Sequence, residues 1–390
     1  MTLPIPLFPP PALEPEAELL LASVRAMAQG FAARAADYDR TRTFPAENLV
    51  AINAAGLNRM FLPEEYGGAP LSYAAYLACL MEISSACAST GLIWATNFHA
   101  GGPVAAFGTA DQKSRFLPVL AEGGLAALAI TEPVGGSNAT SMRTQFRPEG
   151  DEVVVEGGKC FITNGGLADF YLLFGKWSEL GDGKEAVTAL IIEGGTPGLK
   201  MERREKTIGH RASQTAVLAF ESCRVPRANV LQSPGDGLKI LLAALNKSRP
   251  SVAAHAVGIA RAALSDMVNY ANTREINGQT LLRHQGNRFN VAELASDLAL
   301  CEAALWSLAR QVDAGARDIA LLAAALKMRA GDIAVRAALE AIQLQGGYGY
   351  TEDVRAERLL RDAKLMQIGE GTAESLKDFI GRAFIKQAAR

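Results

Sequence analysis

The spacing of hydrophobic residues divides the chain into three zones. Between residues 14 and 125 apolar positions recur every three or four residues, as Leu20 and Val24 do, which is the period of an amphipathic helix. Residues 126–232 instead contain short runs of β-branched and aromatic residues bounded by glycine pairs, a pattern typical of strands and turns. From residue 237 onward the helical period returns in longer segments.

The runs in the second and third zones predict individual elements. We expect strands around residues 153–155, 170–174, 187–192 and 216–220, and long helices over residues 238–273, 286–313 and 318–345. Long helices around one small β-unit predict an α+β fold that is mainly α. We therefore expect three domains, namely an N-terminal helical domain (1–125), a middle β domain (126–235) and a C-terminal helical domain (236–390).

The composition is that of a globular protein. The 390 residues are 49% hydrophobic and 21% charged, which is too apolar for a disordered chain. The net charge of −2 provides no electrostatic footprint for nucleic acid or an anionic membrane. No apolar run approaches the ~20 residues that a bilayer span needs, and the proline-rich, acidic start lacks the basic region of a signal peptide. We therefore expect a cytoplasmic protein that binds neither nucleic acid nor membrane.

Cysteine and histidine usage argues against a metal site and a disulfide framework. The five cysteines are scattered and include no C-x-x-C pair, and the four histidines form no H-x-x-H pair. The chain also lacks the motifs of a phosphate-binding P-loop and of a hydrolase nucleophile elbow. We therefore expect chemistry that needs no protein-bound metal.

Two glycine-rich segments of the middle zone could hold a ligand. Residues 129–138 combine two glycines with Thr and Ser, which leaves backbone N–H groups uncovered for a polar heterocycle or a pyrophosphate. In residues 158–166, Phe161 and Thr163 stand two apart on an expected strand, so a flat ligand could stack on one and hydrogen-bond the other. On its own, each segment has a simpler interpretation, as a turn and as a core Phe beside a satisfied Thr.

Three segments of the C-terminal zone carry further candidates. Arg274, in the last turn of a long helix, becomes a phosphate ligand only if an anion approaches; otherwise it is a surface residue. Gly346 and Gly347 have the pattern of a helix C-cap. Glu370 stands alone between two glycines after an apolar stretch, and a carboxylate presented by a flexible turn is what a general base needs.

Taken in order, these segments form a specific set of motifs. The sequence contains T-E-P-x-x-G-S, K-x-F-I-T-N-G, R-x-S-x-T with V-P-x-x-N-V-L, Q-x-x-G-G-x-G-Y, R-D-A-K and I-x-E-G-T. The set strongly resembles the acyl-CoA dehydrogenase family of FAD enzymes, over nearly the whole chain from Glu14 to Arg382. The resemblance implies an N-terminal helical domain, a middle β-barrel and a C-terminal four-helix bundle.

The resemblance also implies an activity and a catalytic base. Family members remove the α-proton of an acyl thioester with a Glu carboxylate and pass the β-hydride to flavin N5, and the matching Glu is Glu370. Its backbone N–H and a ribityl hydroxyl of the flavin would polarise the thioester carbonyl. Some relatives carry the base in the cluster that is here Lys247 to Pro250; we assign that position to Lys247, which is no base at neutral pH, so Glu370 is the only candidate.

The remaining site residues are those that the resemblance implies. The resemblance assigns FAD contacts to Ile130, Thr131, Gly136, Ser137, Phe161, Thr163, Arg274, His284, Gln285, Gln343, Gly346, Gly347 and Thr372, those from Arg274 to Gly347 reaching a neighbouring subunit's flavin. It assigns acyl-CoA contacts to Ser137, Arg249, Arg317 and Gly371. It further implies a homotetramer built as a dimer of dimers, and an electron-transfer flavoprotein as electron acceptor.

One departure from the family pattern bears on the substrate. Most members carry an aromatic residue directly before the base, where this chain has Gly369. We therefore expect a branched, cyclic or otherwise non-linear acyl group. Open alternatives on the same fold are a flavin oxidase or oxygenase, a thioester lyase, or a dehydrogenase of acyl groups on a carrier protein. A non-catalytic binding protein is a further alternative, against which the intact Glu370 and flavin segments argue.

Overall fold

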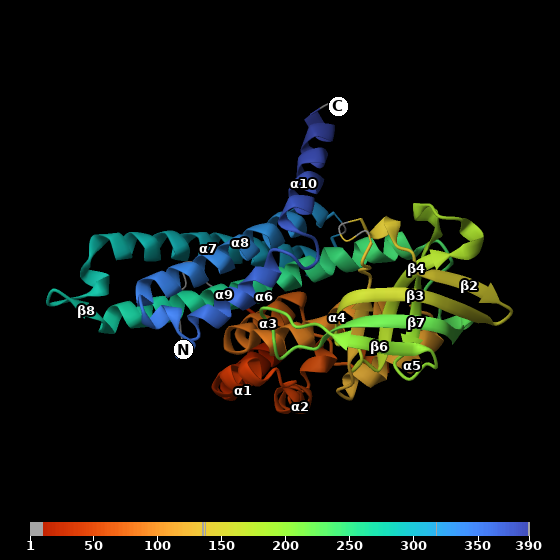
Figure 1. Ribbon diagram of the computed structural model, residues 1–390, viewed down its shortest axis with the longest axis horizontal. Coiled ribbons are helices and arrows are strands. Elements are labelled where there is room, and N and C mark those ends of the chain that lie inside the picture. Colours follow the sequence, from red (N-terminus) through yellow and green to blue (C-terminus); the bar gives the residue numbers. More distant parts are fainter. Residues whose placement is uncertain (1–10, 135, 137, 317, 389–390) are drawn as a thin grey trace.

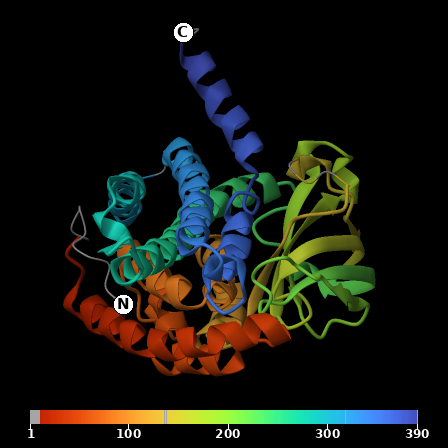
Figure 2. The same cartoon turned by 60° about the vertical axis from the view of Figure 1, so that its left-hand side comes forward.

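Helices form the first part of the computed structural model, which describes residues 11–134, 136, 138–316 and 318–388. They are α1 (Pro15–Thr41), α2 (Ala46–Ala54), α3 (Tyr73–Ala86), α4 (Ala88–Phe107) and α5 (Ala110–Ala121). α5 begins with a capping box in which Thr109 and Gln112 satisfy each other's backbone N–H groups. α3 and α4 are buried on most of their surface, so they form the layer between the rest of the chain and the outer helix α1 (Figure 2).

A seven-stranded curled sheet follows. Its strands are β1 (Ala126–Ala129), β2 (Gln145–Glu149), β3 (Glu152–Thr163), β4 (Phe170–Trp177), β5 (Val187–Glu193), β6 (Leu199–Arg204) and β7 (Thr215–Pro226). The order is β1-β4-β2-β3-β7-β6, with β5 on β4, and all pairs are antiparallel except β1–β4 and β2–β4. The pairings of the described strands thus form an open path rather than the closed ring of a barrel. The four predicted strands are β3, β4, β5 and β7.

The sheet has an apolar core on each face. On its concave side Phe146, Val155, Leu173 and Phe220 are almost completely buried against one another. The other face packs against α4 and α5, and Leu117 and Phe170 belong to that second core. The sheet is therefore fixed to the N-terminal helices.

The last part of the chain is helical again. It comprises α6 (Gly237–Thr273), the hairpin of β8 (Glu275–Ile276) and β9 (Gln279–Thr280), α7 (Gln285–Asp313), α8 (Ala320–Gln345), α9 (Ala356–Met366) and α10 (Ala373–Ala388). Helices α6 to α9 pack on one another, and α6 also packs on α3 and α4. α10 projects away from the other helices in both views (Figures 1 and 2). The three predicted long helices are α6, α7 and α8.

The length of α6 separates two regions of the molecule. Its 37 residues correspond to about 54 Å of helix. It begins against β5 and ends at the β8–β9 hairpin, so the sheet and the hairpin lie at opposite ends of the chain's long axis (Figure 1). Within the described residues, no helix is both long and apolar enough to cross a membrane.

Candidate active site

The turn between α9 and α10 presents Glu370 in a conformation that few residues adopt. Its φ is +56°, in the left-handed region, and Gly371 follows with a φ of +108°. The Arg249 Nε donates to the Glu370 carbonyl oxygen at 3.4 Å, and the Lys327 Nζ donates to the Gly371 carbonyl oxygen at 2.6 Å. Two cations from α6 and α8 therefore hold a backbone conformation that is otherwise unfavourable, as is common at functional sites.

The carboxylate of Glu370 is oriented by a hydroxyl from α6. Ser248 Oγ donates to Glu370 Oε2 at 2.8 Å, and the Ser248 side chain is buried. Lys247, the position that we assigned from sequence to the alternative base, is exposed and lies on another face of the helix. Within the cluster from Lys247 to Pro250, the side chain that contacts the Glu370 carboxylate is therefore that of Ser248 and not that of Lys247.

Both cations beside Glu370 are affected by burial. Burial lowers the pKa of Lys327 to about 8, an effect that Glu370 opposes and Arg249 reinforces. Burial likewise lowers the pKa of Arg249, and Glu370 again opposes the shift. The sequence analysis missed Lys327. Lys327 lies on the buried face of α8 with Ala323, Ala330 and Ala334. A single Lys among apolar residues at helical spacing is a pattern from which the sequence could have identified it.

A second cluster lies at the end of β3. Phe161 is 64% exposed and has a φ of +58°, which is exceptional for an aromatic residue. The register of β3 against β7 shifts between Lys159 and Ile162, so a bulge interrupts the alternation on which we predicted a common face for Phe161 and Thr163. The consequence is an uncovered aromatic ring on an irregular backbone, beside half-buried Thr163.

A buried ion pair ties this strand to the segment after β1. Lys159 Nζ donates to Glu132 Oε1 at 2.6 Å and to the Ile130 carbonyl oxygen at 2.9 Å, and both charged side chains are at most 5% exposed. The Cys160 N–H donates to the Thr131 carbonyl oxygen at 2.9 Å. The structure thus brings the backbone of Ile130 and Thr131 against Lys159 and Cys160, directly before Phe161.

A third cluster lines a groove of about 720 Å³ where α6, α8 and the hairpin meet. Its lining includes the predicted residues Arg274, Gln343, Gly346 and Gly347, together with Tyr270 and Tyr348. His284 and Gln285 are outside this lining, at the start of α7, which follows the hairpin directly. The groove lies at the opposite end of α6 from the sheet, so one chain does not bring the second and third clusters together (Figure 1).

The other predicted residues have the following positions. Gly371 is part of the Glu370 turn, and the Thr372 hydroxyl accepts the Ser375 N–H at the start of α10. Gly136 is exposed. Ser137 and Arg317 lie outside the described residues, so the structure contains nothing about either position.

Three domains of one family match this chain. The acyl-CoA dehydrogenase N-terminal domain matches residues 14–124, the middle domain residues 127–223 and the C-terminal domain residues 235–385. Among curated relatives, the probable acyl-CoA dehydrogenase fadE25 of Mycobacterium leprae is 36% identical, over 98% of this chain and 98% of that protein.

Solved structures show the same architecture along the whole chain. Butyryl-CoA dehydrogenase from Megasphaera elsdenii superimposes with a TM-score of 0.92 at 32% identity, over 96% of this chain and 99% of that one. A chain from a study of the electron transferring flavoprotein of Acidaminococcus fermentans gives 0.92 at 33% identity, covering 96% and 98%. A glutaryl-CoA dehydrogenase from Mycobacterium smegmatis in complex with FADH2 gives 0.88 at 25% identity, covering 95% of each chain.

Proposed function

The chain belongs to the acyl-CoA dehydrogenase family of oxidoreductases acting on CH–CH groups, and on this basis we propose that it removes the α-proton of an acyl-CoA thioester through Glu370. The observation that carries the proposal is the geometry of the Glu370 turn. A left-handed carboxylate residue is held by Arg249 and Lys327 through two carbonyl groups, and its side chain is oriented by Ser248. A turn that stores such strain, with two residues on its carbonyl groups and one on its carboxylate, fits a general base.

The residues at the end of β3 fit FAD, the cofactor that the family implies. Exposed Phe161 offers a ring face to a flat heterocycle, with Thr163 as a polar neighbour, and Ile130 and Thr131 lie on the adjoining segment. FAD bound there would supply the acceptor for the hydride that leaves the β-carbon. This chain's own residues would bind and orient it, while Glu370 accepts the α-proton and its backbone N–H faces the thioester carbonyl.

The separation of the two predicted flavin-binding clusters supports an oligomer. Arg274 and Gln343 line the groove where α6 ends at the β8–β9 hairpin, whereas Phe161 lies on the sheet, against which α6 begins. A second copy that brought its groove to the sheet of the first would complete one flavin site. We propose a homotetramer built as a dimer of dimers, and a flavin-loaded monomer in light scattering would contradict it.

The space beside the base supports a bulky acyl group. The three atoms nearest to a Cβ added at Gly369 all belong to Leu365, at 3.6 to 3.9 Å, and the φ of Gly369 is outside the positive range, so the glycine is not needed for the backbone. The family pattern implies an aromatic ring at this position, and the absence of a side chain here supports a wider acyl pocket. We propose a branched, cyclic or aryl-substituted acyl-CoA as substrate. We also propose the domain boundaries 1–125, 126–235 and 236–390, a cytoplasmic location, and an electron-transfer flavoprotein as partner.

The experiment is an anaerobic titration of the purified flavoprotein with butyryl-CoA, octanoyl-CoA, isobutyryl-CoA, cyclohexanecarbonyl-CoA and 3-phenylpropanoyl-CoA. Bleaching of the flavin that persists after air is admitted supports a dehydrogenase. Rapid recolouring with peroxide or an oxygenated product supports the second candidate, an oxidase or oxygenase on the same fold. A flavin that none of the thioesters bleaches contradicts the proposal.

A further inference from the structure

α6 carries a line of buried polar side chains along an otherwise apolar face. Ser248, Ser251 and His255 stand three, four and seven residues apart and are each at most 2% exposed. Ser248 binds Glu370, and Ser251 Oγ lies 3.0 Å from His99 Nε2 and 2.8 Å from the Tyr76 hydroxyl. The third member, His255, has partners outside the proposed active site.

His255 joins three parts of the chain that are distant in sequence. Its Nδ1 lies 2.7 Å from the hydroxyl of Ser84 on α3, and its Nε2 lies 2.9 Å from Nε2 of His210. His210 belongs to the loop between β6 and β7 and is 2% exposed. A single imidazole of the C-terminal helices therefore bonds both to the N-terminal helices and to the sheet.

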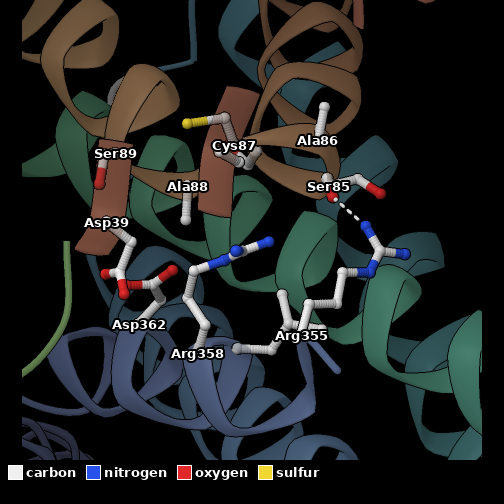
Figure 3. Close-up of a pocket in the computed structure, with 12 residues that line it drawn as sticks. Asp39, Ser85, Ala86, Cys87, Ala88, Ser89, Arg355, Arg358 and Asp362 are labelled. Atoms are coloured by element: carbon white, nitrogen blue, oxygen red, sulfur yellow. Dashed lines mark hydrogen bonds between the residues drawn. The ribbon is translucent and has the colours of Figure 1, made fainter. Parts of the chain in front are cut away.

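The chain of hydrogen bonds ends at a carboxylate on α9. The His210 backbone N–H donates to Asp362 Oδ1, and the His210 Nδ1 lies 3.8 Å from the same oxygen. Asp362 and Ser84, the two ends of the chain, both line a cavity of about 10 Å³, beside Asp39, Ser89 and Arg358 (Figure 3). A cavity of this size and polarity holds about one water molecule.

One arrangement of protons satisfies the hydrogen bonds from Ser84 to His255 and from His255 to His210, and His210 Nδ1, 3.8 Å from Asp362, makes no hydrogen bond. Two imidazole nitrogens 2.9 Å apart require one donor and one acceptor. Burial lowers the pKa of both histidines; Asp362 opposes the shift of His210, whereas His210 and His99 reinforce that of His255. With both rings neutral, Ser84 donates to His255, His255 donates to His210, and the His210 Nδ1–H faces the Asp362 carboxylate. The reverse order would point a lone pair of His210 at that carboxylate.

The loop that carries His210 continues directly into the Phe161 cluster. Thr215, at the start of β7, pairs with Thr163, and Gln214 exchanges two hydrogen bonds with Asn164 and Gly165, of 2.8 and 2.9 Å. The same loop packs tightly on α9, because a Cβ added at Gly209 would lie 2.2 Å from the Arg361 carbonyl oxygen. A displacement of His210 would therefore be transmitted to the Phe161–Thr163 segment.

We propose that the His210–His255 hydrogen bond fixes the Phe161–Thr163 segment relative to the part of α6 that holds Glu370, which makes both histidines positioning residues for the proposed reaction. The inference rests on the proposed function in one respect, namely that the substrate reacts between the Phe161–Thr163 segment and Glu370. His255 is two helical turns from Ser248, and His210 is five residues from Thr215. The base and the hydride acceptor take hydrogens from adjacent carbons, so their relative position must be fixed. A misplacement of about 1 Å costs about 10²-fold in rate.

The first test compares His255→Leu, which fills the space but cannot hydrogen-bond, with His255→Gln. The amide of Gln offers a donor and an acceptor about as far apart as the two imidazole nitrogens. Ser265→Ala is the matched control, because Ser265 is a buried hydroxyl on the same helix, ten residues beyond His255. We measure anaerobic flavin reduction by the most reactive of the five thioesters at saturation, and by dithionite, which needs no alignment.

We expect His255→Leu to slow reduction by the thioester about 10²-fold per bound flavin, with reduction by dithionite unchanged. His255→Gln should recover most of the rate, and Ser265→Ala should match the wild type. If His255→Leu binds flavin normally and is reduced by the thioester within twofold of the wild type, the proposal is overturned. A loss confined to flavin content, with a normal rate per bound flavin, also overturns it, because that is a purely structural effect.

A second measurement needs no activity. Thermal unfolding of His255→Leu, His210→Asn and the double variant forms a double-mutant cycle for the His210–His255 hydrogen bond. We expect the double variant to lose clearly less than the sum of the single losses, because either change alone breaks the same bond. Additive losses of stability would show that His210 and His255 are not coupled, which would contradict the proposal. If the cycle shows coupling while no thioester reduces the wild-type flavin, the proposed function fails, but the structural link between His210 and His255 is confirmed.

Discussion

Ser248 donates a hydrogen bond of 2.8 Å from its Oγ to Oε2 of Glu370. The two residues lie on different elements, α6 and the turn after α9, so the bond fixes the carboxylate against the helix. Ser248→Ala should leave flavin binding intact and slow flavin reduction by acyl-CoA by about 10- to 100-fold, because a hydrogen bond to a charged group contributes about 1.5–3 kcal/mol. Stopped-flow reduction under anaerobic conditions checks this. An unchanged rate would show that the hydroxyl does not orient the base.

Gly369 tests the proposed width of the acyl pocket. Gly369→Tyr should strongly slow reduction by cyclohexanecarbonyl-CoA, through steric overlap with the ring, and affect butyryl-CoA far less. Gly369→Ala is the control, and it should be nearly neutral because its Cβ would meet Leu365 only at ordinary contact distance. A uniform loss with all thioesters in both variants would contradict the wide pocket and indicate a backbone role for the glycine.

The buried pair of Lys159 and Glu132 gives a prediction on stability. Lys159→Met leaves the Glu132 carboxylate buried beside Thr144 and the Arg143 backbone, without its cation. We expect this variant to lose about 3–5 kcal/mol in the free energy of unfolding, and the double variant Lys159→Met/Glu132→Gln to lose clearly less. Urea unfolding measures both values. A double variant that is as unstable as the single one would show that packing, rather than charge, dominates at this site.

The same pair predicts a sensitivity to acid. Burial raises the pKa of Glu132, but Lys159, Thr144 and the Arg143 backbone outweigh it, so the pKa lies below its ordinary value of 4.5. A carboxyl with a lowered pKa in the folded state contributes stability that is present above pH 4.5 and is lost as the pH falls below it. The melting temperature of the wild type should therefore fall more steeply between pH 5 and 3 than that of the double variant. Parallel curves would contradict the prediction.

The sequence predicted regular elements well where one residue pattern controls each of them. The period in residues 238–273 reproduces α6 almost to its ends, because a long helix with one buried face repeats its signal many times. The short strands β1, β2 and β6 were not predicted, because four to six residues carry too little periodicity. The order and the curling of the strands in the sheet are tertiary properties that no strand pattern encodes.

The residues of the candidate site could be predicted from the sequence only where they belong to a recognised motif. Glu370 and Phe161 came from motifs, whereas Ser248 and Lys327 act through contacts between elements that are far apart in sequence. The left-handed backbone at Phe161 follows from a bulge whose position depends on β7. The chain from Ser84 to Asp362 joins four segments, and only the fold brings them together.

Glu370→Gln tests the central claim most directly, because it removes the basic oxygen and keeps the shape of the side chain. The measurement is anaerobic flavin reduction by the thioester that is fastest with the wild type, alongside flavin content and reduction by dithionite. If Glu370 accepts the α-proton, flavin content and the dithionite rate stay unchanged, while reduction by the thioester falls by about 10²–10⁴-fold or more. A Glu370→Gln variant that carries flavin and is reduced by the thioester within a few-fold of the wild-type rate would contradict the assignment of Glu370 as the base.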